Sequence, residues 1–222
     1  MLLNIDREED LRMAVDALRA GKLVAFPTET VYGLGADGFN EEACRAVYAA
    51  KGRPSDNPLI LHIADMSALR DIAEDIPEAA VDLAEAFWPG PLTLVLKKRR
   101  NVSSVVSGGL DTVAVRMPDN DLARRLIRAL GHPLAGPSAN LSGHPSPTLA
   151  AHVEHDFGDH IAGVVDGGPC RVGVESTIVD LTVQPYAILR PGGIPREKIE
   201  ALIGPVTEAA PLGDSDAPKA PG

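Results

Sequence analysis

Hydrophobic positions in the N-terminal part of the chain change from helical spacing to a short continuous run. Between residues 11 and 18, apolar side chains recur at helical spacing, which predicts an amphipathic helix that Asp6 caps and Gly21 ends. The apolar run at 23–26 is typical of a short buried strand. The segment 27–35 that follows is rich in hydroxyls and glycine, as loops are. The pattern therefore predicts a helix, a strand and then a polar loop.

The same two patterns recur along the rest of the chain and predict an alternating series of elements. Further helices are expected at 40–51, 67–74, 77–87, 119–130 and 148–157. Further strands are expected at 59–63, 93–96, 113–117, 133–135, 163–166, 176–181 and 187–190. Because strands and helices interleave without a strict βα repeat, we expect an α/β fold with a mixed sheet rather than a purely parallel one.

The last part of the chain differs in composition from the rest. From about Pro205 onward it is largely Ala, Pro, Gly and Asp, with few large apolar side chains. Such a segment buries too little apolar surface to offset the entropy lost on ordering. The sequence therefore predicts one domain at 1–204 and a disordered C-terminal tail at 205–222. A chain of 222 residues, 45% of them hydrophobic, suits that organisation.

Charge and cysteine content narrow the classes of function. The net charge is −10, whereas general nucleic-acid binders are more often basic, so phosphate-binding residues would have to be concentrated in a cleft. Cys44 and Cys170 form neither a metal-binding spacing nor a disulfide framework, which favours a reducing compartment. The acidic N-terminus is unlike a signal peptide, and no apolar stretch reaches the ~20 residues of a membrane span. We therefore expect a cytoplasmic protein that does not bind a membrane.

Lys51 and Arg53 are the first candidate ligand-binding residues. They lie where a predicted helix meets a loop bounded by Pro54 and Pro58. Arginine offers a planar fork and lysine a compact charge, and both suit phosphate. Two cations at a helix C-terminus are also favoured by the helix dipole, and the pair alone favours that structural interpretation. Asn57 adds a polar group of a kind that is equally common in turns.

Three charged or titratable side chains interrupt or end apolar strands. Arg116, within 113–117, needs a partner, because burying an unpaired charge is costly. That partner is either a protein carboxylate or a ligand carboxylate, and the residues leave both open. Arg190, at a strand end, would need such a partner too, although its position gives a weaker argument for burial. His62, within 59–63, fits a core histidine whose hydrogen bonds are satisfied.

Hydroxyl side chains gather in loops but match no common catalytic motif. Thr28, Thr30 and Tyr32 could bind a carboxylate, although ordinary turn chemistry explains them at least as well. Ser176 begins a predicted strand, and Ser138 is not part of a GxSxG motif, so a serine hydrolase is a poor fit. GxxxxGK[ST] does not occur, which excludes the common P-loop for nucleotides.

Two charged clusters are best interpreted as solvated surface. His152 and His155 could share a helix face, as metal ligands sometimes do, but no compact ligand motif is present and we expect no protein metal site. The basic run at 97–100 fits either a solvated turn or a contact with RNA phosphates, and the turn is favoured.

Seven segments, taken together, resemble the YrdC/TsaC-like family of threonylcarbamoyl-AMP synthases. The matching segments are 27–35, 51–59, 88–93, 113–118, 137–140, 175–180 and 189–193. Each one alone is weak, whereas all of them in the family's order, over roughly residues 8–204, form a highly specific match. The chain looks like the family's short form, which has the synthase domain alone.

The resemblance implies a fold and a reaction. The fold would be a twisted mixed open sheet flanked by helices, similar to double-stranded-RNA-binding-like domains, with the active site on its concave face. The reaction would be nucleotidyl transfer that converts L-threonine, bicarbonate or CO2, and ATP into L-threonylcarbamoyl-AMP and pyrophosphate. That product feeds formation of N6-threonylcarbamoyladenosine at position 37 of tRNA, where other proteins of the machinery make the final transfer. A weak tRNA contact and Mg2+ bound with ATP belong to the same expectation.

The resemblance also assigns site residues. The family's threonine site falls on Thr30, His62, Arg116, Ser138 and Ser176. Its ATP site falls on Arg53, Asn57, Thr112, Asn140, Thr148 and Arg190, with Lys51 beside it. The residues expected to be catalytic are Lys51, Arg53, Ser138 and Asn140. In this interpretation Arg116 binds the threonine carboxylate, while Lys51, Arg53 and Arg190 offset the charge of the triphosphate.

Two other functions remain open for the same fold. One is formation of a carbamoyl adenylate from carbamoyl phosphate, as in related hydrogenase-maturation proteins. Those proteins carry acylphosphatase and Cys-rich zinc modules, for which this chain has no room. The other is a tRNA-binding or double-stranded-RNA-binding protein, against which the net charge of −10 argues if binding is strong and non-specific.

Overall fold

The structure, a computed structural model, describes residues 1–209 and 218. Its α-helices are α1 Glu8–Arg19, α2 Glu41–Lys51, α3 Leu69–Ile72, α4 Glu78–Phe87, α5 Asp121–Leu130, α6 Ala150–Phe157 and α7 Arg196–Ile203. Its strands are β1 Leu2–Leu3, β2 Val24–Phe26, β3 Gly33–Asp37, β4 Ile60–His62, β5 Leu92–Lys97, β6 Thr112–Arg116, β7 Leu134–Gly136, β8 Gly163–Val165, β9 Thr177–Asp180, β10 Ala187–Arg190 and β11 Thr207–Glu208. Short 3-10 helices occupy Met66–Ala68 and Gly158–His160.

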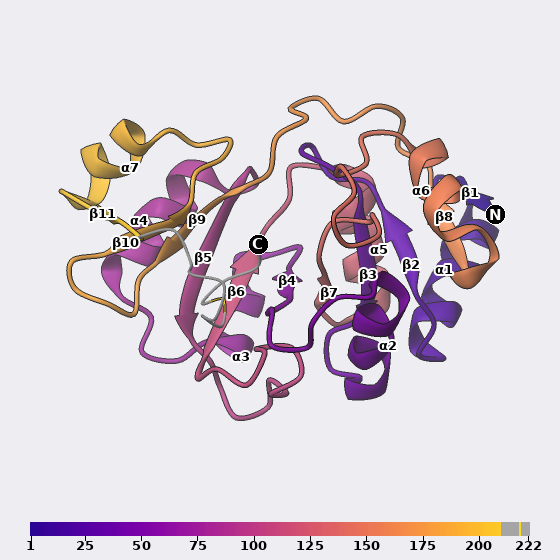
Figure 1. Ribbon diagram of the computed structural model, residues 1–222, viewed down its shortest axis with the longest axis horizontal. Coiled ribbons are helices and arrows are strands. Elements are labelled where there is room, and N and C mark those ends of the chain that lie inside the picture. Colours follow the sequence, from indigo (N-terminus) through magenta and orange to yellow (C-terminus); the bar gives the residue numbers. More distant parts are fainter. Residues whose placement is uncertain (210–217, 219–222) are drawn as a thin grey trace.

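The strands of the described residues join in one sheet with the order β1-β8-β2-β3-β7-β4-β6-β5-β9-β10-β11. Parallel neighbours, such as β4 with β6 and β5 with β9, alternate with antiparallel neighbours, such as β5 with β6 and β9 with β10. Along the long axis of the molecule, β9, β10, α4 and α7 lie at one end, and α1, α6, β1 and β8 lie at the other (Figure 1). The predicted α/β fold with a mixed open sheet is confirmed.

The two faces of the sheet bury different clusters of side chains. On one face, Leu61 of β4 and Val113 of β6 join the main core, against which α2 and α4 pack. On the other face, α1 and α5 pack together over the half of the sheet around β2, where Phe26 is fully buried. The remaining half of this second face carries Ile60 and Ala114, which belong to a small separate apolar cluster. The candidate site lies on this second face.

Local signals explain where most helices begin, and one predicted cap is wrong. The Asn40 side chain accepts a hydrogen bond from the Ala43 N–H at the start of α2, as predicted. Helix α1 begins at Glu8 without a side-chain cap, so Asp6 does not cap it. The acidic side chains of its first turn favour the helix dipole instead. Helix α5 begins after Asn120, whose side chain caps it, two residues later than predicted.

Strand β3 is the largest element that the sequence pattern missed. The segment 27–35 was expected to be a loop, but its last part forms β3 between β2 and β7. Glycine-rich segments have low strand propensity, so the pairing here reflects tertiary context. The backbones of β3 and β7 approach closely, because a Cβ atom at Gly136 would lie 2.1 Å from the Leu34 carbonyl oxygen. The glycine before the 137–140 segment is therefore needed for this contact.

Ordered structure continues past the predicted domain boundary at 204/205. Helix α7, which the sequence pattern did not predict, leads to Val206, whose side chain is buried in the main core. Strand β11 then pairs with β10 in parallel. The burial of Val206 and this pairing supply the stabilisation that the composition did not reveal. The parts of the predicted tail at 210–217 and 219–222 lie outside the described residues.

Candidate functional site

A polar cavity opens on the second face of the sheet, where several strands end. It is lined from the loop after β2, from β4 and β6, from the loop after β7, and from the segment that leads into β9. All five residues predicted for the threonine site line it, namely Thr30, His62, Arg116, Ser138 and Ser176. Two residues predicted for the ATP site, Arg53 and Arg190, also line it. Residues far apart in the sequence are thus brought to one cavity by the order of the strands.

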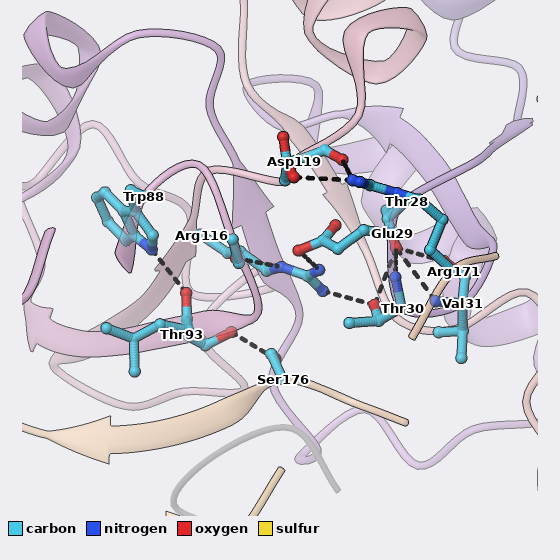
Figure 2. A network of polar contacts seen from close by, with 12 residues as sticks. Thr28, Glu29, Thr30, Val31, Trp88, Thr93, Arg116, Asp119, Arg171 and Ser176 are labelled. Carbon is cyan, nitrogen blue, oxygen red and sulfur yellow. Dashed lines mark hydrogen bonds and ion pairs between the residues drawn. The ribbon is translucent and has the colours of Figure 1, made fainter. Parts of the chain in front are cut away.

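Arg116 is buried at the end of β6 and has a protein partner. Its Nη2 lies 2.6 Å from Oε1 of Glu29, and both side chains are almost fully buried. Its Nη1 donates to the Thr30 hydroxyl at 3.0 Å, and its Nε donates to the Gly90 carbonyl at 3.3 Å (Figure 2). The question that the sequence left open has a definite answer: Arg116 pairs with a protein carboxylate and still lines the cavity.

His62 stands next to Arg116 across the β4–β6 pairing and is held uncharged. Burial, with the nearby positive charge of Arg116, lowers the pKa of His62 to about 3. Its ring packs edge-on against Phe26, and Nδ1 lies 3.3 Å from the Leu134 carbonyl oxygen. A carbonyl only accepts, so Nδ1 carries the proton and Nε2 is the acceptor. His62 therefore offers the cavity a neutral imidazole rather than a cation.

Ser176 and Arg190 form a second polar group beside the cavity. The Ser176 hydroxyl lies 2.8 Å from that of Thr93, and it accepts from Nη2 of Arg190 at 3.2 Å. Nη1 of Arg190 forms an ion pair of 2.8 Å with Glu175, which also lines the cavity. A cation, a carboxylate and a hydroxyl thus lie within contact of one another, so this wall can bind both charged and neutral polar groups.

The other hydroxyls of the 27–35 segment mainly hold the backbone. The Thr28 hydroxyl donates to the Val31 carbonyl at 2.6 Å and accepts from the Thr30 and Val31 amides, as a turn residue does. The Tyr32 hydroxyl donates to the Gly168 carbonyl at 2.8 Å, and burial raises its pKa to about 12. Turn chemistry, one of the two interpretations of these residues, accounts for Thr28, whereas Tyr32 makes a long-range contact.

Lys51 holds the loop that contains Ser138 and Asn140. Its Nζ donates to the Ser138 carbonyl at 2.5 Å and also to the Asn140 carbonyl. Burial, with the nearby charge of Arg53, lowers the pKa of Lys51 to about 7. An amine has at least two N–H groups in either protonation state, which is enough for the two carbonyls. Lys51 is not among the described residues that line the cavity, so its contacts with the site are made through the loop.

Arg53 follows Lys51 closely yet takes a different position. Gly52 ends α2 in the left-handed region with φ 62°, so the chain turns away from the helix between the two cations. Arg53 Nη2 donates to the Pro58 carbonyl at 3.0 Å and contacts Oδ1 of Asn57, while its Nε donates to the Asn57 carbonyl at 3.3 Å. Asn57 therefore orients Arg53 at the cavity.

Four residues predicted for the ATP site do not line this cavity, and one of them is Asn57, which contacts Arg53. Asn140 is buried, and its Nδ2 donates to the Leu141 carbonyl at 2.9 Å and to the His144 carbonyl at 2.8 Å, within its own loop. Thr148 lines a neighbouring pocket. Thr112 begins β6 on the same face as Arg116, four residues along the strand and hence ~13 Å away. Of the six residues predicted for the ATP site, two thus line the cavity and four lie outside it.

The charged clusters outside the cavity behave as surface groups. His155 and His144 lie near Asp156, at 3.3 and 3.7 Å. Among the residues that the structure describes, no group of three or more His, Cys, Asp or Glu side chains could hold a metal ion. In the basic run at 97–100, Lys97 is exposed and pairs with Glu74 and Asp75. No helix of the described part of the chain is long and apolar enough to cross a membrane.

Two carboxylates of the site were not singled out from the sequence. Glu29 lies within the 27–35 segment and Glu175 begins the 175–180 segment, but each stands among residues with clearer signals. The need of the buried Arg116 for a partner was the signal that could have directed attention to Glu29. Nothing in the sequence distinguishes Glu29 from the other acidic residues as that partner.

Fold and cavity together define an α/β protein whose mixed sheet carries a polar cavity, lined among others by hydroxyls, a neutral histidine and three arginines. The family model for the Sua5/YciO/YrdC domain, described as "Telomere recombination", matches residues 16–192. This chain belongs to that family.

Individual relatives agree with the family assignment. A threonylcarbamoyl-AMP synthase of Pyrococcus abyssi is 55% identical over 217 residues, which cover 97% of this chain and 64% of the relative. A putative threonylcarbamoyl-AMP synthase of Mycobacterium tuberculosis (strain H37Rv) is 39% identical over 198 residues, which cover 89% of this chain and 91% of the relative. The solved structure of P. abyssi Sua5 complexed with L-threonine matches with a TM-score of 0.95 and 52% identity, covering 100% of this chain and 67% of that one. The aligned region thus spans 64% of the P. abyssi synthase and 67% of its solved chain.

Proposed function

We propose that this chain is an L-threonylcarbamoyladenylate synthase of the cytoplasm. It combines L-threonine, bicarbonate or CO2, and ATP into threonylcarbamoyl-AMP and pyrophosphate, which the tRNA-modification machinery uses at adenosine 37. The observation that carries the proposal is the meeting of Thr30, His62, Arg116, Ser138 and Ser176 in one cavity. The names of the relatives and the L-threonine bound to P. abyssi Sua5 support it.

The chemistry of the cavity suits a small polar amino acid. Arg116 lies at its wall with an orientation fixed by three contacts, and an arginine fork is well suited to the two oxygens of a carboxylate. The neutral His62 and the hydroxyls of Ser138 and Ser176 can serve the amino and hydroxyl groups of threonine. Because His62 is uncharged, it does not repel an ammonium group.

The second half of the same sheet face suits a nucleotide. A strip of apolar side chains runs beside the cavity. It lies between the two ends of β6, which are Arg116 and Thr112. Its buried members are Ile60, Val95, Ala114 and Ile178. Ile60, the member of this strip that lines the cavity, could pack against a nucleobase or ribose, while Arg53 and Arg190 at the cavity suit phosphates. ATP would enter as its Mg2+ complex. Glu175 is the carboxylate among the described residues of the cavity wall that could reach that ion, which would otherwise be held by phosphates and water.

The proposed reaction has two steps. The threonine amine attacks the carbon of CO2 and loses a proton, which gives N-carboxythreonine; with bicarbonate as the source, a C–O bond also breaks and one water leaves. An oxygen of that carbamate then attacks the α-phosphorus of ATP in line, and the bond to pyrophosphate breaks. Positioning by Arg116 and Ser138, with charge stabilisation by Arg53 and Arg190, would supply most of the rate enhancement. Burial raises the pKa of Cys170 to about 11, which disfavours a thiolate nucleophile.

A test of this proposal is the release of pyrophosphate by the folded protein supplied with ATP and bicarbonate. Release that depends on L-threonine, and that carbamoyl phosphate neither replaces nor increases, supports the synthase. Release that requires carbamoyl phosphate instead would contradict it and favour carbamoyl-adenylate chemistry. If neither compound gives release and the protein shifts tRNA with a steep salt dependence, the RNA-binding function replaces the proposal.

A further inference from the structure

Glu29 is a buried carboxylate directly behind the cavity, within the segment whose hydroxyls line it. Thr28 and Thr30 on either side of it line the cavity, whereas Glu29 is not among the lining residues that the structure describes. Its side chain is 2% exposed, and that of its partner Arg116 is 4% exposed. Glu29 therefore cannot touch a ligand in the cavity directly, and any effect on binding must pass through Arg116.

The contact between Glu29 and Arg116 is mutual. Oε1 of Glu29 lies 2.6 Å from Nη2, and no other described residue donates a hydrogen bond to either carboxylate oxygen. In Figure 2 the carboxylate of Glu29 lies against the guanidinium of Arg116, next to the Thr28–Val31 turn. A buried carboxylate needs a counter-charge, and a buried guanidinium needs one equally. The charge of Glu29 therefore stabilises Arg116 in its buried position, and the charge of Arg116 stabilises Glu29 in the same way.

Three contacts fix the plane and the direction of the Arg116 fork. Nε donates to the Gly90 carbonyl, Nη1 donates to the Thr30 hydroxyl, and Nη2 contacts Glu29. A guanidinium has five N–H groups. Nη2 is buried against Glu29, so among the described residues it is the second N–H of Nη1 that remains for a ligand. Such a charged donor forms a strong hydrogen bond with a carboxylate oxygen.

The orientation of Arg116 also reaches the Thr30 hydroxyl. The Thr28 hydroxyl donates to the Val31 carbonyl, so in the 2.9 Å contact between the two threonines it is Thr30 that donates. Thr30 in turn accepts from Arg116, which makes a chain of donors from the guanidinium to the turn. A change in the angle of Arg116 would therefore disturb two cavity side chains at once.

We infer that Glu29 is a positioning residue for the amino-acid half of the site, which holds Arg116 in the direction that binds the substrate carboxylate. This role rests on the proposed function, because it takes the carboxylate of L-threonine as the group that Arg116 binds. It predicts that loss of the Glu29 charge weakens the binding of L-threonine while ATP binding changes little. It also predicts that the effect disappears when Arg116 is already absent.

The test measures the dissociation constant of L-threonine by calorimetry for the wild type, Glu29→Gln, Arg116→Gln and the double variant. Glutamine keeps the shape of Glu29 and removes its charge. We expect Glu29→Gln to weaken L-threonine binding by about tenfold, corresponding to loss of one well-aligned contact. We expect the double variant to bind no more weakly than Arg116→Gln alone, since the two residues act as one unit. In steady-state kinetics, Glu29→Gln should raise KM for L-threonine with kcat and the KM for ATP nearly unchanged.

The matched control is Asp119→Asn, which removes an exposed carboxylate that pairs with Arg171 in the same region (Figure 2). Its L-threonine affinity should stay within about twofold of the wild type, as expected of an exposed pair.

A folded Glu29→Gln protein with wild-type affinity overturns the inference, as does a further loss of affinity in the Arg116→Gln background. If Glu29→Gln does not fold, the comparison of the double variant with Arg116→Gln still decides, because the double variant leaves no buried charge. A wild type that binds no L-threonine would contradict the proposed function itself. A wild type that binds L-threonine, together with a Glu29→Gln variant that binds it equally well, would contradict only the role of Glu29.

Discussion

Two buried cations flank the candidate site, and their surroundings differ. Arg116 is 4% exposed and Lys51 is 3% exposed. Arg116 contacts the carboxylate of Glu29 and lines the cavity. Lys51 contacts no carboxylate and gives its amine to two backbone carbonyls of the neighbouring loop.

The difference separates two tasks that a basic residue can have near an active site. A guanidinium keeps its charge in any protein, so a buried one requires an anion and can bind a second one. An amine can lose its charge when it is buried, and the pKa of Lys51 is lowered to about 7. Arg116 is therefore suited to binding the substrate, and Lys51 is suited to holding the Ser138–Asn140 loop in place.

Arg116→Gln gives the largest expected effect, because it leaves Glu29 buried without its counter-charge. The free energy of unfolding in urea should fall by about 3–5 kcal/mol, as when one partner of a buried pair is removed. Arg128→Gln is the matched control. It removes an exposed arginine that pairs with Asp65 and should cost less than about 1 kcal/mol. Equal losses in the two variants would mean that burial of Arg116 does not carry the stabilisation assigned to it.

Lys51→Met should cost less than Arg116→Gln, since it strands no charge. The carbonyls of Ser138 and Asn140 lose their donor, and we expect the free energy of unfolding to fall by about 2 kcal/mol. Lys97→Met, which removes an exposed lysine, is the control and should change stability by less than about 1 kcal/mol. If Lys51→Met destabilised the protein as much as Arg116→Gln, the proposed difference between the two cations would be wrong.

The pH dependence of stability distinguishes the cations further. The pKa of Lys51 is about 7 in the folded protein and near the ordinary 10.5 when unfolded, so between these values the unfolded chain holds a proton that the folded one lacks. Stability from this group therefore rises with pH across that window, by at most ~1.4 kcal/mol per pH unit, and is lost as pH falls toward 7. Urea titrations at several pH values should show this rise in the wild type relative to Lys51→Met. A pH-independent difference would mean that Lys51 stays charged when folded.

Thr112→Val gives the smallest expected effect and probes the end of β6 remote from Arg116. If Thr112 binds the nucleotide as proposed, loss of that one hydrogen bond should raise KM for ATP by about 3–10-fold while KM for L-threonine stays constant. Thr207→Val, on the exposed strand β11, should change neither constant. If Thr112→Val alters L-threonine binding instead, the assignment of the two ends of β6 to two substrates is wrong.

Most elements of the fold could be predicted from local patterns. Strands β4 and β6 appear where apolar runs placed them, and the Asn40 cap sets the start of α2. Strand β3 could not be predicted in this way, because its glycines are poor strand formers and its pairing comes from β2 and β7 on either side. Helix α7 was missed, although its buried Ile199 joins the main core.

The members of the site could be predicted better than their contacts. The family resemblance named seven of the residues that line the cavity, whereas four residues that it named for the ATP site lie outside it. Sequence reasoning showed that Arg116 needs a partner but could not choose Glu29, because the pair is formed by segments that meet only in the folded protein. It also placed Lys51 beside the triphosphate, whereas its amine contacts the Ser138–Asn140 loop. Such contacts depend on tertiary geometry, which spacing along the chain does not record.

Mass spectrometry of the reaction products is the most direct test of the central claim. The folded protein would be supplied with ATP, L-threonine and 13C-labelled bicarbonate. We predict threonylcarbamoyl-AMP that carries the label in its carbamoyl carbon, formed together with an equal amount of pyrophosphate. If the protein is folded and supplied with these substrates but forms no labelled threonylcarbamoyl-AMP, the proposal that it is a synthase is contradicted.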